Sequence, residues 1–168
     1  MTQLHAQPYD LSATGFYFET VEEYRTKAEK NVNDYGDPVE EYELQFIDGD
    51  QLDCALAKAW GLYQSNFATF LEKAEEWEDW EKVNYIIAVG ECGCDHDEIA
   101  DNPSTADLTL YECETMKGLA EQFVDDGLFG EIPERLQFYL DYDAIARDLS
   151  FDYSEITIAG THYIFHCN

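Results

Sequence analysis

The fold class follows from the stretch EYELQFIDGDQLDCALAKAW, residues 41–60, because the period of its apolar side chains changes along it. Over residues 41–46, acids and amides alternate with apolar residues, which predicts a half-buried strand. The side chains expected to face inward are Tyr42, Leu44 and Phe46. Asp48-Gly49 predicts a turn and Asp50 can cap a helix, whose apolar residues recur at helical spacing: Leu52, Leu56, Ala59, Trp60 and Tyr63. A strand followed directly by a helix is therefore predicted.

On the amino-terminal side of this stretch, the sequence predicts one short strand and one helix. Residues 1–14 are polar and turn-like, whereas GFYFE at residues 15–19 has the pattern of a short strand. Thr20 and Glu23 form a capping-box pattern, which predicts a helix that runs to about residue 32. The loop-forming residues NDYGDP follow at positions 33–38.

A second central helix is predicted by apolar residues at helical spacing: Phe67, Phe70, Leu71, Ala74 and Trp77. The same helix is expected to present an acid-dense face made of Glu72, Glu75, Glu76, Glu78 and Asp79. Residues 83–89 form a short apolar run, whose periodicity leaves helix and strand open. Residues 90–103 are expected to form a loop.

The last third of the chain predicts short helices and strands. A strand is expected at residues 108–111, and a helix at residues 115–126 that ends before Gly127. Two short helices are expected over residues 132–149, with Pro133 suited to a first helical position. Alternating residues on both sides of Gly160 predict a closing β-hairpin.

Together these elements predict an α+β fold with small antiparallel sheets at both ends and a helical middle. Three subdomains are expected, at residues 1–50, 51–105 and 106–168, the last with the closing hairpin. An elongated shape is expected, because like charges spread along a rod repel one another less than charges gathered on a sphere.

The composition combines strong acidity with a large apolar fraction. The 37 Asp and Glu against 9 Lys and Arg give a formal net charge of -28, while 45% of the residues are hydrophobic and 15% aromatic. A disordered acidic tail carries far fewer aromatic residues, so a folded protein with an acidic surface is predicted. No apolar run of 18 residues and no signal-peptide pattern is present, and a cytoplasmic location is expected.

The net negative charge restricts the classes of molecule that the protein can bind. Nucleic acid and anionic membranes are repelled, whereas a basic surface is attracted. Because duplex DNA carries one charge per roughly 1.7 Å, 28 charges correspond to roughly 48 Å, or about 14 base pairs. The acids are dispersed except in the acid-free residues 54–71, and dispersion suits imitation of a regular phosphate array. Adaptation to high salt is the alternative explanation for such a surface.

The sequence does not indicate a catalytic or metal site. The nucleophile-elbow, Walker and dinucleotide-binding patterns are absent, so neither an enzyme nor a cofactor is expected. The best metal candidate, CGCDHDE at residues 92–98, lacks the spacing of zinc and calcium sites. The five irregularly spaced cysteines are expected to be free thiols. His162 and His166 share one face of a strand and need no ligand.

The most specific stretch is GLFGEIPERLQFYLDYDAIARDL, residues 127–149. It resembles the carboxy-terminal antirestriction motif of ArdA proteins, in which an Ile/Val-Pro pair precedes an aromatic-rich helix pair and a closing strand. The acidic strand at residues 40–46 is similar to one that precedes the central helices of that family. The resemblance spans residues 15–165 and departs from the family before residue 15, where the usual opening strand and loop are shortened to polar residues.

The resemblance implies an elongated, non-enzymatic homodimer, encoded on mobile genetic elements, that competes with DNA for the basic cleft of type I restriction–modification enzymes. The family's motif lies at its dimer interface, which here implies Leu136, Phe138, Tyr139, Leu140, Tyr142 and Ile145. These apolar residues exceed what so small a region can bury, although a purely local core is the alternative.

The acids of the expected DNA-mimic surface are spread over most of the chain. They are Glu40, Glu41, Glu43, Glu72, Glu75, Glu76, Glu78, Asp79, Glu121, Asp125, Asp126, Glu131, Glu134, Asp141, Asp143 and Asp148. A second hypothesis is an acidic regulatory or scaffold protein that binds another basic DNA-binding protein, which would need no long regular array. A third is a metal-binding protein or an enzyme.

Overall fold

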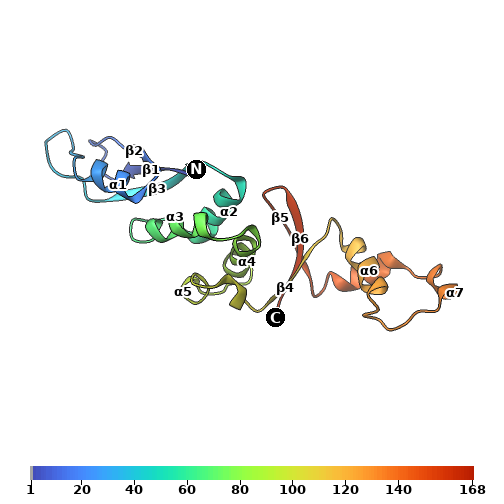
Figure 1. The fold of residues 1–168 in the computed structure, drawn as a ribbon. Coiled ribbons are helices and arrows are strands. Elements are labelled where there is room, and N and C mark those ends of the chain that lie inside the picture. Colours follow the sequence, from blue (N-terminus) through green and yellow to red (C-terminus); the bar gives the residue numbers. More distant parts are fainter. Residues whose placement is uncertain (1) are drawn as a thin grey trace. The chain divides into compact units, whose positions relative to one another are not determined.

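The computed structural model describes residues 2–168, which divide into two compact units, one that ends at Ala106 and one over Asp107–Asn168. Each unit contains a three-stranded antiparallel sheet and several short helices (Figure 1). The predicted α+β class is therefore confirmed. Over the residues described, no helix is both long and apolar enough to cross a bilayer.

The sheet of the first unit is built around its first strand. β1 (Gln3–Pro8) lies between β2 (Phe16–Phe18) and β3 (Tyr42–Asp48), and Leu4 faces Phe18 on one side and Phe46 on the other. The expectation of a turn-like segment before residue 15 was wrong. Leu4 and Ala6 are fully buried and alternate with polar neighbours, so this short segment supplies the central strand of the sheet.

The predicted strand over residues 41–46 is confirmed and extends to Asp48. Tyr42 and Leu44 are buried and Phe46 is half-buried, whereas the acid Glu43 points outward. The alternation of the sequence therefore gave the correct inward face.

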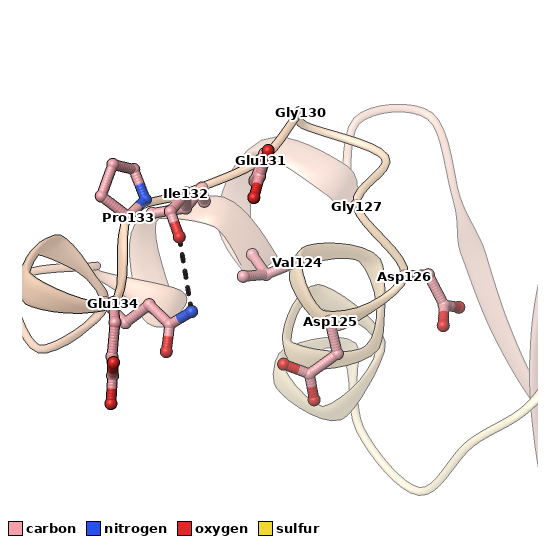
Figure 2. A pocket seen from close by; sticks show the side chains of 10 residues that line it. Val124, Asp125, Asp126, Gly127, Gly130, Glu131, Ile132, Pro133 and Glu134 are labelled. Atoms are coloured by element: carbon pink, nitrogen blue, oxygen red, sulfur yellow. Dashed lines mark hydrogen bonds between the residues drawn. The ribbon is translucent and has the colours of Figure 1, made fainter.

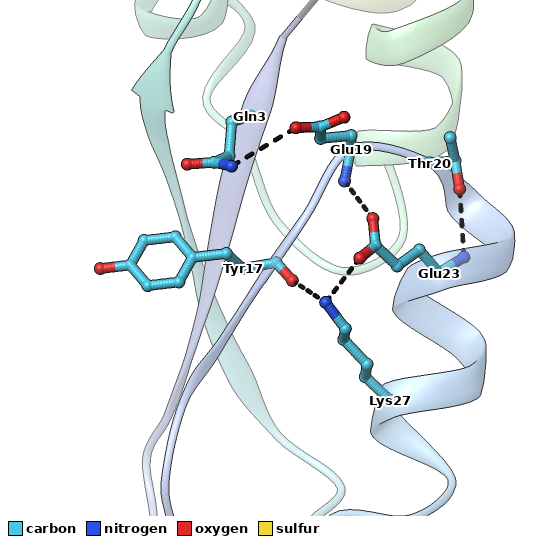
Figure 3. A network of polar contacts seen from close by, with 6 residues as sticks. All are labelled: Gln3, Tyr17, Glu19, Thr20, Glu23 and Lys27. Carbon is cyan, nitrogen blue, oxygen red and sulfur yellow. Dashed lines mark hydrogen bonds and ion pairs between the residues drawn. The ribbon is translucent and has the colours of Figure 1, made fainter.

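Helix α1 (Val21–Ala28) begins with one half of the predicted capping box. The Thr20 hydroxyl accepts a hydrogen bond from the Glu23 amide at 3.1 Å, but the Glu23 carboxylate accepts from the Glu19 amide instead of the Thr20 amide (Figure 3). The same carboxylate pairs with Lys27, which lowers the pKa of Glu23. The helix ends at Ala28, four residues before the expected end.

The helices of the first unit are α2 (Gln51–Trp60), α3 (Phe67–Glu76), α4 (Asp79–Gly90) and the one-turn α5 (His96–Ile99), followed by the 3-10 turn η1 (Pro103–Thr105). The predicted Asp50 cap is confirmed, since its carboxylate accepts from the Leu52 amide at 2.8 Å. Residues 83–89, for which the sequence left both helix and strand open, are helical and belong to α4. The expected loop over residues 90–103 contains α5 and the start of η1.

The sequence predicted one helix with an acid-dense face from Phe67 to Asp79, but the structure has two helices there. Trp77 adopts extended backbone and ends α3, and Glu78 then starts α4, where its amide donates to the Glu81 carboxylate at 2.9 Å. Glu78 and Asp79 therefore do not share a helix with Glu72, Glu75 and Glu76. The periodic pattern concealed the break because Trp77 is buried and fits the apolar spacing.

An aromatic cluster fills the helical part of the first unit. Trp60 contacts the rings of Phe70, Trp77, Tyr85 and His96. The Tyr85 hydroxyl and His96 Nδ1 are joined by a hydrogen bond of 2.5 Å, and burial raises the pKa of Tyr85. His96, the histidine of the metal candidate, thus serves in packing. Within residues 2–168, no three His, Cys, Asp or Glu side chains form a group that could hold a metal ion.

In the second unit, β6 (Thr161–Cys167) lies between β4 (Leu108–Glu112) and β5 (Ser154–Ile158). The predicted hairpin is confirmed, and its two turn residues, Ala159 and Gly160, have φ of 50° and 87°. Helix α6 (Met116–Asp125) buries Leu119 and Phe123 against Ile164 of the sheet. The predicted helix at residues 115–126 and its end before Gly127 are also confirmed.

Two short helices complete the second unit, as expected. They are α7 (Glu134–Gln137) and α8 (Tyr142–Leu149), and α8 packs against α6. Pro133 caps α7 instead of occupying its first turn. The ring nitrogen Nδ1 of His162 is 2.7 Å from the Cys113 carbonyl, and that of His166 is 2.6 Å from the Asp152 carbonyl. Cys54, Cys94 and Cys113 carry free thiols, but Cys92 and Cys167 do not, so the expectation of five free thiols was wrong for these two.

A buried ion pair joins two helices of the first unit. Lys82 Nζ on α4 lies 2.7 Å from Asp53 Oδ1 on α2, and both residues are at most 9% exposed. Lys82 is the only buried Lys or Arg among residues 2–168. Removing one partner would leave the other charge buried without compensation, which is the costly case for such pairs.

We therefore expect Lys82→Met to lower the free energy of unfolding by about 3–5 kcal/mol, measured by urea denaturation. The double variant Asp53→Leu/Lys82→Met should regain most of the loss, because it buries no lone charge. Lys73→Met, which breaks the more exposed pair with Glu76 in the same unit, is the control and should cost less than about 1 kcal/mol. Equal losses in the two single variants would contradict the assigned role of the buried pair.

Candidate functional site

Nearly all carboxylates of the chain lie on its surface. Of the 37 Asp and Glu, all but Glu19, Glu23, Asp53 and Glu81 are exposed. The sixteen acids expected to form the functional surface are exposed without exception. Folding around the aromatic cores therefore leaves these charges in contact with solvent or with a partner.

Few cations neutralise this surface. Of the sixteen acids, only Glu76 and Asp143 lie within 4.0 Å of a cationic nitrogen in the described part of the chain, at 3.2 Å from Lys73 and 3.1 Å from Lys117. Both pairs are partly exposed and contribute little to stability. The remaining acids have no cationic partner among the described residues, so the surface that they form is strongly acidic.

Some of these acids lie where they disfavour folding. Asp125 is in the last turn of α6 and Asp126 is its C-cap, where carboxylates oppose the helix dipole, and this turn has no basic residue. On α3, Glu72 and Glu76 are four residues apart and repel each other. Apart from the partly exposed pair of Glu76 with Lys73, these positions are unfavourable for helix stability.

Other acids of the set stabilise the helices that carry them. Asp79 is in the first turn of α4, and Asp141 caps α8 by accepting from the Ala144 amide at 3.0 Å. Asp143 follows in the first turn of the same helix. Carboxylates at these positions interact favourably with the helix dipole, so their presence needs no partner.

The structure brings several predicted acids together in each unit. In the first unit, Glu72, Glu75 and Glu76 on α3 precede Glu78 and Asp79 at the α3–α4 junction. In the second unit, four acids line one hollow of about 620 Å³: Asp125, Asp126, Glu131 and Glu134. The acids Glu40, Glu41 and Glu43 belong to the edge strand β3 and the residues before it.

The hollow of the second unit lies between the end of α6 and the loop that leads to α7 (Figure 2). Gly127 and Gly130 have φ of 74° and 87°, a conformation that favours glycine, and they direct the loop around the hollow. Val124, Ile132 and Pro133 give it apolar walls. Gln137 donates to the Ile132 carbonyl at 3.5 Å and links α7 to the loop.

Several apolar side chains of residues 127–151 are exposed. Phe138 and Tyr139 are 89% and 84% exposed, Leu136 is exposed, and Leu140, Tyr142 and Ile145 are half-buried. Neither α7 nor α8 contains a buried residue. These six residues are here named the motif patch. Leu136, Phe138 and Tyr139 therefore do not belong to a local core, whereas Leu140, Tyr142 and Ile145 are partly covered.

Three further exposed apolar residues in this region were not predicted: Leu128, Phe129 and Phe151. Leu128 and Phe129 stand between two glycines with positive φ, outside any helix or strand. Periodicity therefore gave no signal for them. The one available signal was the presence of large apolar residues in a loop, where burial is hard to achieve.

A protein-family model described as "Antirestriction protein (ArdA)" matches residues 9–163 of the 168. The match extends over most of both compact units, without strand β1, and includes all sixteen acids and the motif patch. The expected family resemblance is therefore confirmed. Among curated proteins, no sequence matches the chain.

Asp125 lies in the last turn of α6 and Asp143 in the first turn of α8, so neutralising each should change the free energy of unfolding in opposite directions. Asp125→Asn removes a carboxylate from the last turn of α6 and should raise the free energy of unfolding by about 0.3–1 kcal/mol at low ionic strength. Asp143→Asn removes one from the first turn of α8, together with its Lys117 pair, and should lower it by a similar amount. Chemical denaturation of both variants measures the difference. Equal increases would mean that total charge outweighs helix position.

Proposed function

The chain belongs to the ArdA family of antirestriction proteins, and on this premise we propose that it occupies the DNA-binding cleft of a type I restriction–modification enzyme in place of DNA. The observation that carries the proposal is the solvent-exposed array of carboxylates, of which few are paired with a cation. Such an array presents to a basic cleft the kind of charge that phosphates present.

The binding energy would be distributed over many carboxylates. Individually exposed ion pairs contribute little, so neutralising one acid should change inhibition only slightly. Together the acids raise the association rate and displace counterions from the basic cleft, as DNA does. The role needs binding alone and assigns no catalytic step to any residue of the chain.

We further propose that the motif patch holds two copies together. Phe138 and Tyr139 are the most exposed members of the patch, and large aromatic residues are favourable anchors of interfaces. In a two-fold dimer, the same patch would meet itself, and the acidic surface would be present twice. Two copies would then offer charge equivalent to roughly 28 base pairs of duplex, by the same spacing of phosphates.

The direct test is competition for a purified type I methyltransferase core between this protein and a labelled DNA duplex at moderate fixed salt. We expect stoichiometric displacement of DNA, which weakens as salt rises. A variant with eight acids changed to amides, Glu40, Glu41, Glu72, Glu75, Glu78, Glu121, Glu131 and Glu134, should lose displacement while each single change has little effect. An unrelated folded protein of similar negative charge is the control.

Two outcomes would contradict the proposal. Abolition of displacement by one acid-to-amide change would exclude a distributed charge mechanism. Absence of displacement across several type I enzymes would instead favour an acidic regulatory protein that binds another basic DNA-binding protein.

For the dimer, we expect Phe138→Ser/Tyr139→Ser to weaken self-association by at least tenfold, measured by analytical ultracentrifugation over a range of concentrations. The change should leave the free energy of unfolding of the monomer almost unchanged, because both side chains are more than four-fifths exposed. Exposed Tyr35→Ser in the first unit is the matched control. Unaltered self-association of the double variant would contradict a dimer through the motif patch.

A further inference from the structure

A groove of about 410 Å³ lies in the first unit, between the start of α1 and one face of α3. Three half-buried apolar side chains contribute to its surface: Val21, Ala68 and Leu71. Three carboxylates also line it, those of Glu19, Glu72 and Glu75. The groove therefore combines apolar surface with concentrated negative charge.

The order of residues on α3 explains this combination. Ala68, Glu72 and Glu75 are spaced four and three residues apart, so they lie on one face of the helix, and Leu71 flanks them. The opposite wall comes from the β2–α1 connection, where Glu19 is held in place by a hydrogen bond from its amide to the Glu23 carboxylate. Its own carboxylate accepts from Gln3 Nε2 at 3.4 Å (Figure 3).

Of the cations close to the groove along the chain, Lys27 and Lys73 are engaged elsewhere, whereas exposed Arg25 on α1 forms no ion pair among the described residues. Lys27 Nζ binds the Tyr17 carbonyl at 2.6 Å and the Glu23 carboxylate (Figure 3), and Lys73 pairs with Glu76 on α3. No Lys or Arg of the described residues lines the groove. Among the described residues, no ion pair joins Glu19, Glu72 or Glu75 to a cation, so a cation supplied from outside is complementary to these carboxylates.

We propose that this groove receives an arginine side chain from the basic surface of the target protein. The inference rests on the proposed function, which supplies a basic partner. A guanidinium group is planar and weakly hydrated, so its aliphatic stem and flat face can lie on Val21, Ala68 and Leu71 while its N–H groups donate to carboxylates. A simple counterion gains nothing from the apolar surface. The groove would therefore give the acidic surface one position that recognises a particular side chain.

The first test measures this recognition without a restriction enzyme. N-acetylarginine N-methylamide is titrated into the ¹⁵N-labelled full chain at fixed ionic strength, and amide shifts are followed by NMR. We expect saturable shifts at Thr20, Val21 and Thr69, and none with the uncharged isostere N-acetylcitrulline N-methylamide. Thr69→Trp, which places a bulky side chain at an exposed position of the groove without changing the charge, should weaken binding about fivefold or more.

A matched pair of double variants separates the groove from the general charge. Glu72→Gln/Glu75→Gln removes two charges from the groove and should abolish the saturable shifts, whereas Glu40→Gln/Glu41→Gln removes two exposed charges elsewhere in the same unit and should preserve them. Shifts spread evenly over the acidic surface, or equal effects of the two double variants, would overturn the proposal.

Competition with DNA on the methyltransferase core then distinguishes the two proposals. Loss of arginine binding with intact displacement of DNA would refute the groove alone. Arginine binding at the groove without displacement of DNA would refute the proposed function and leave the groove as a site for another basic protein. If both hold, Thr69→Trp should weaken displacement more than Glu40→Gln/Glu41→Gln, although it removes no charge.

Discussion

Mutual repulsion among the carboxylates is the constraint on which the rest of this structure depends. A net charge of -28 over 168 residues opposes every compact arrangement. The chain resists it with aromatic packing: in the first unit Phe18 contacts Tyr24 and Phe67, and in the second Phe123 contacts Tyr111 and Tyr153. Each large ring removes 150–250 Å², roughly, from water, so few residues supply much of the core. The remaining positions are then free to carry charge.

Secondary structure could be predicted from the sequence wherever the spacing of apolar residues stayed regular to the end of a helix or strand. Strand β3, the cap of α2, the end of α6 and the closing hairpin were all predicted, because alternation or a turn residue marked each of them. Strand β1 was missed because its three buried residues, Leu4, Ala6 and Pro8, include only one large apolar side chain and alternate with polar neighbours. The break at Trp77 was missed because a buried residue continued the helical spacing across it.

Some features of the candidate site could likewise be predicted from the sequence, and others could not. That the acids would be exposed could be predicted, since unpaired charges are rarely buried. The exposure of Phe138 and Tyr139 was foreseen only because the region has too little space to bury so many apolar residues. The hollow beside α6 and the groove beside α3 could not be foreseen. The first depends on the positive φ of Gly127 and Gly130, and the second joins segments about fifty residues apart.

The strand order has a further consequence, for solubility. Exposed edge strands can pair with strands of other molecules and start aggregation, and charges on an edge oppose such pairing. Three of the four edge strands carry exposed acids, with Glu43 on β3, Glu112 on β4 and Glu155 on β5, and the fourth, β2, is only three residues long. The same acidity that opposes folding thus also opposes the pairing of these edge strands with strands of other molecules.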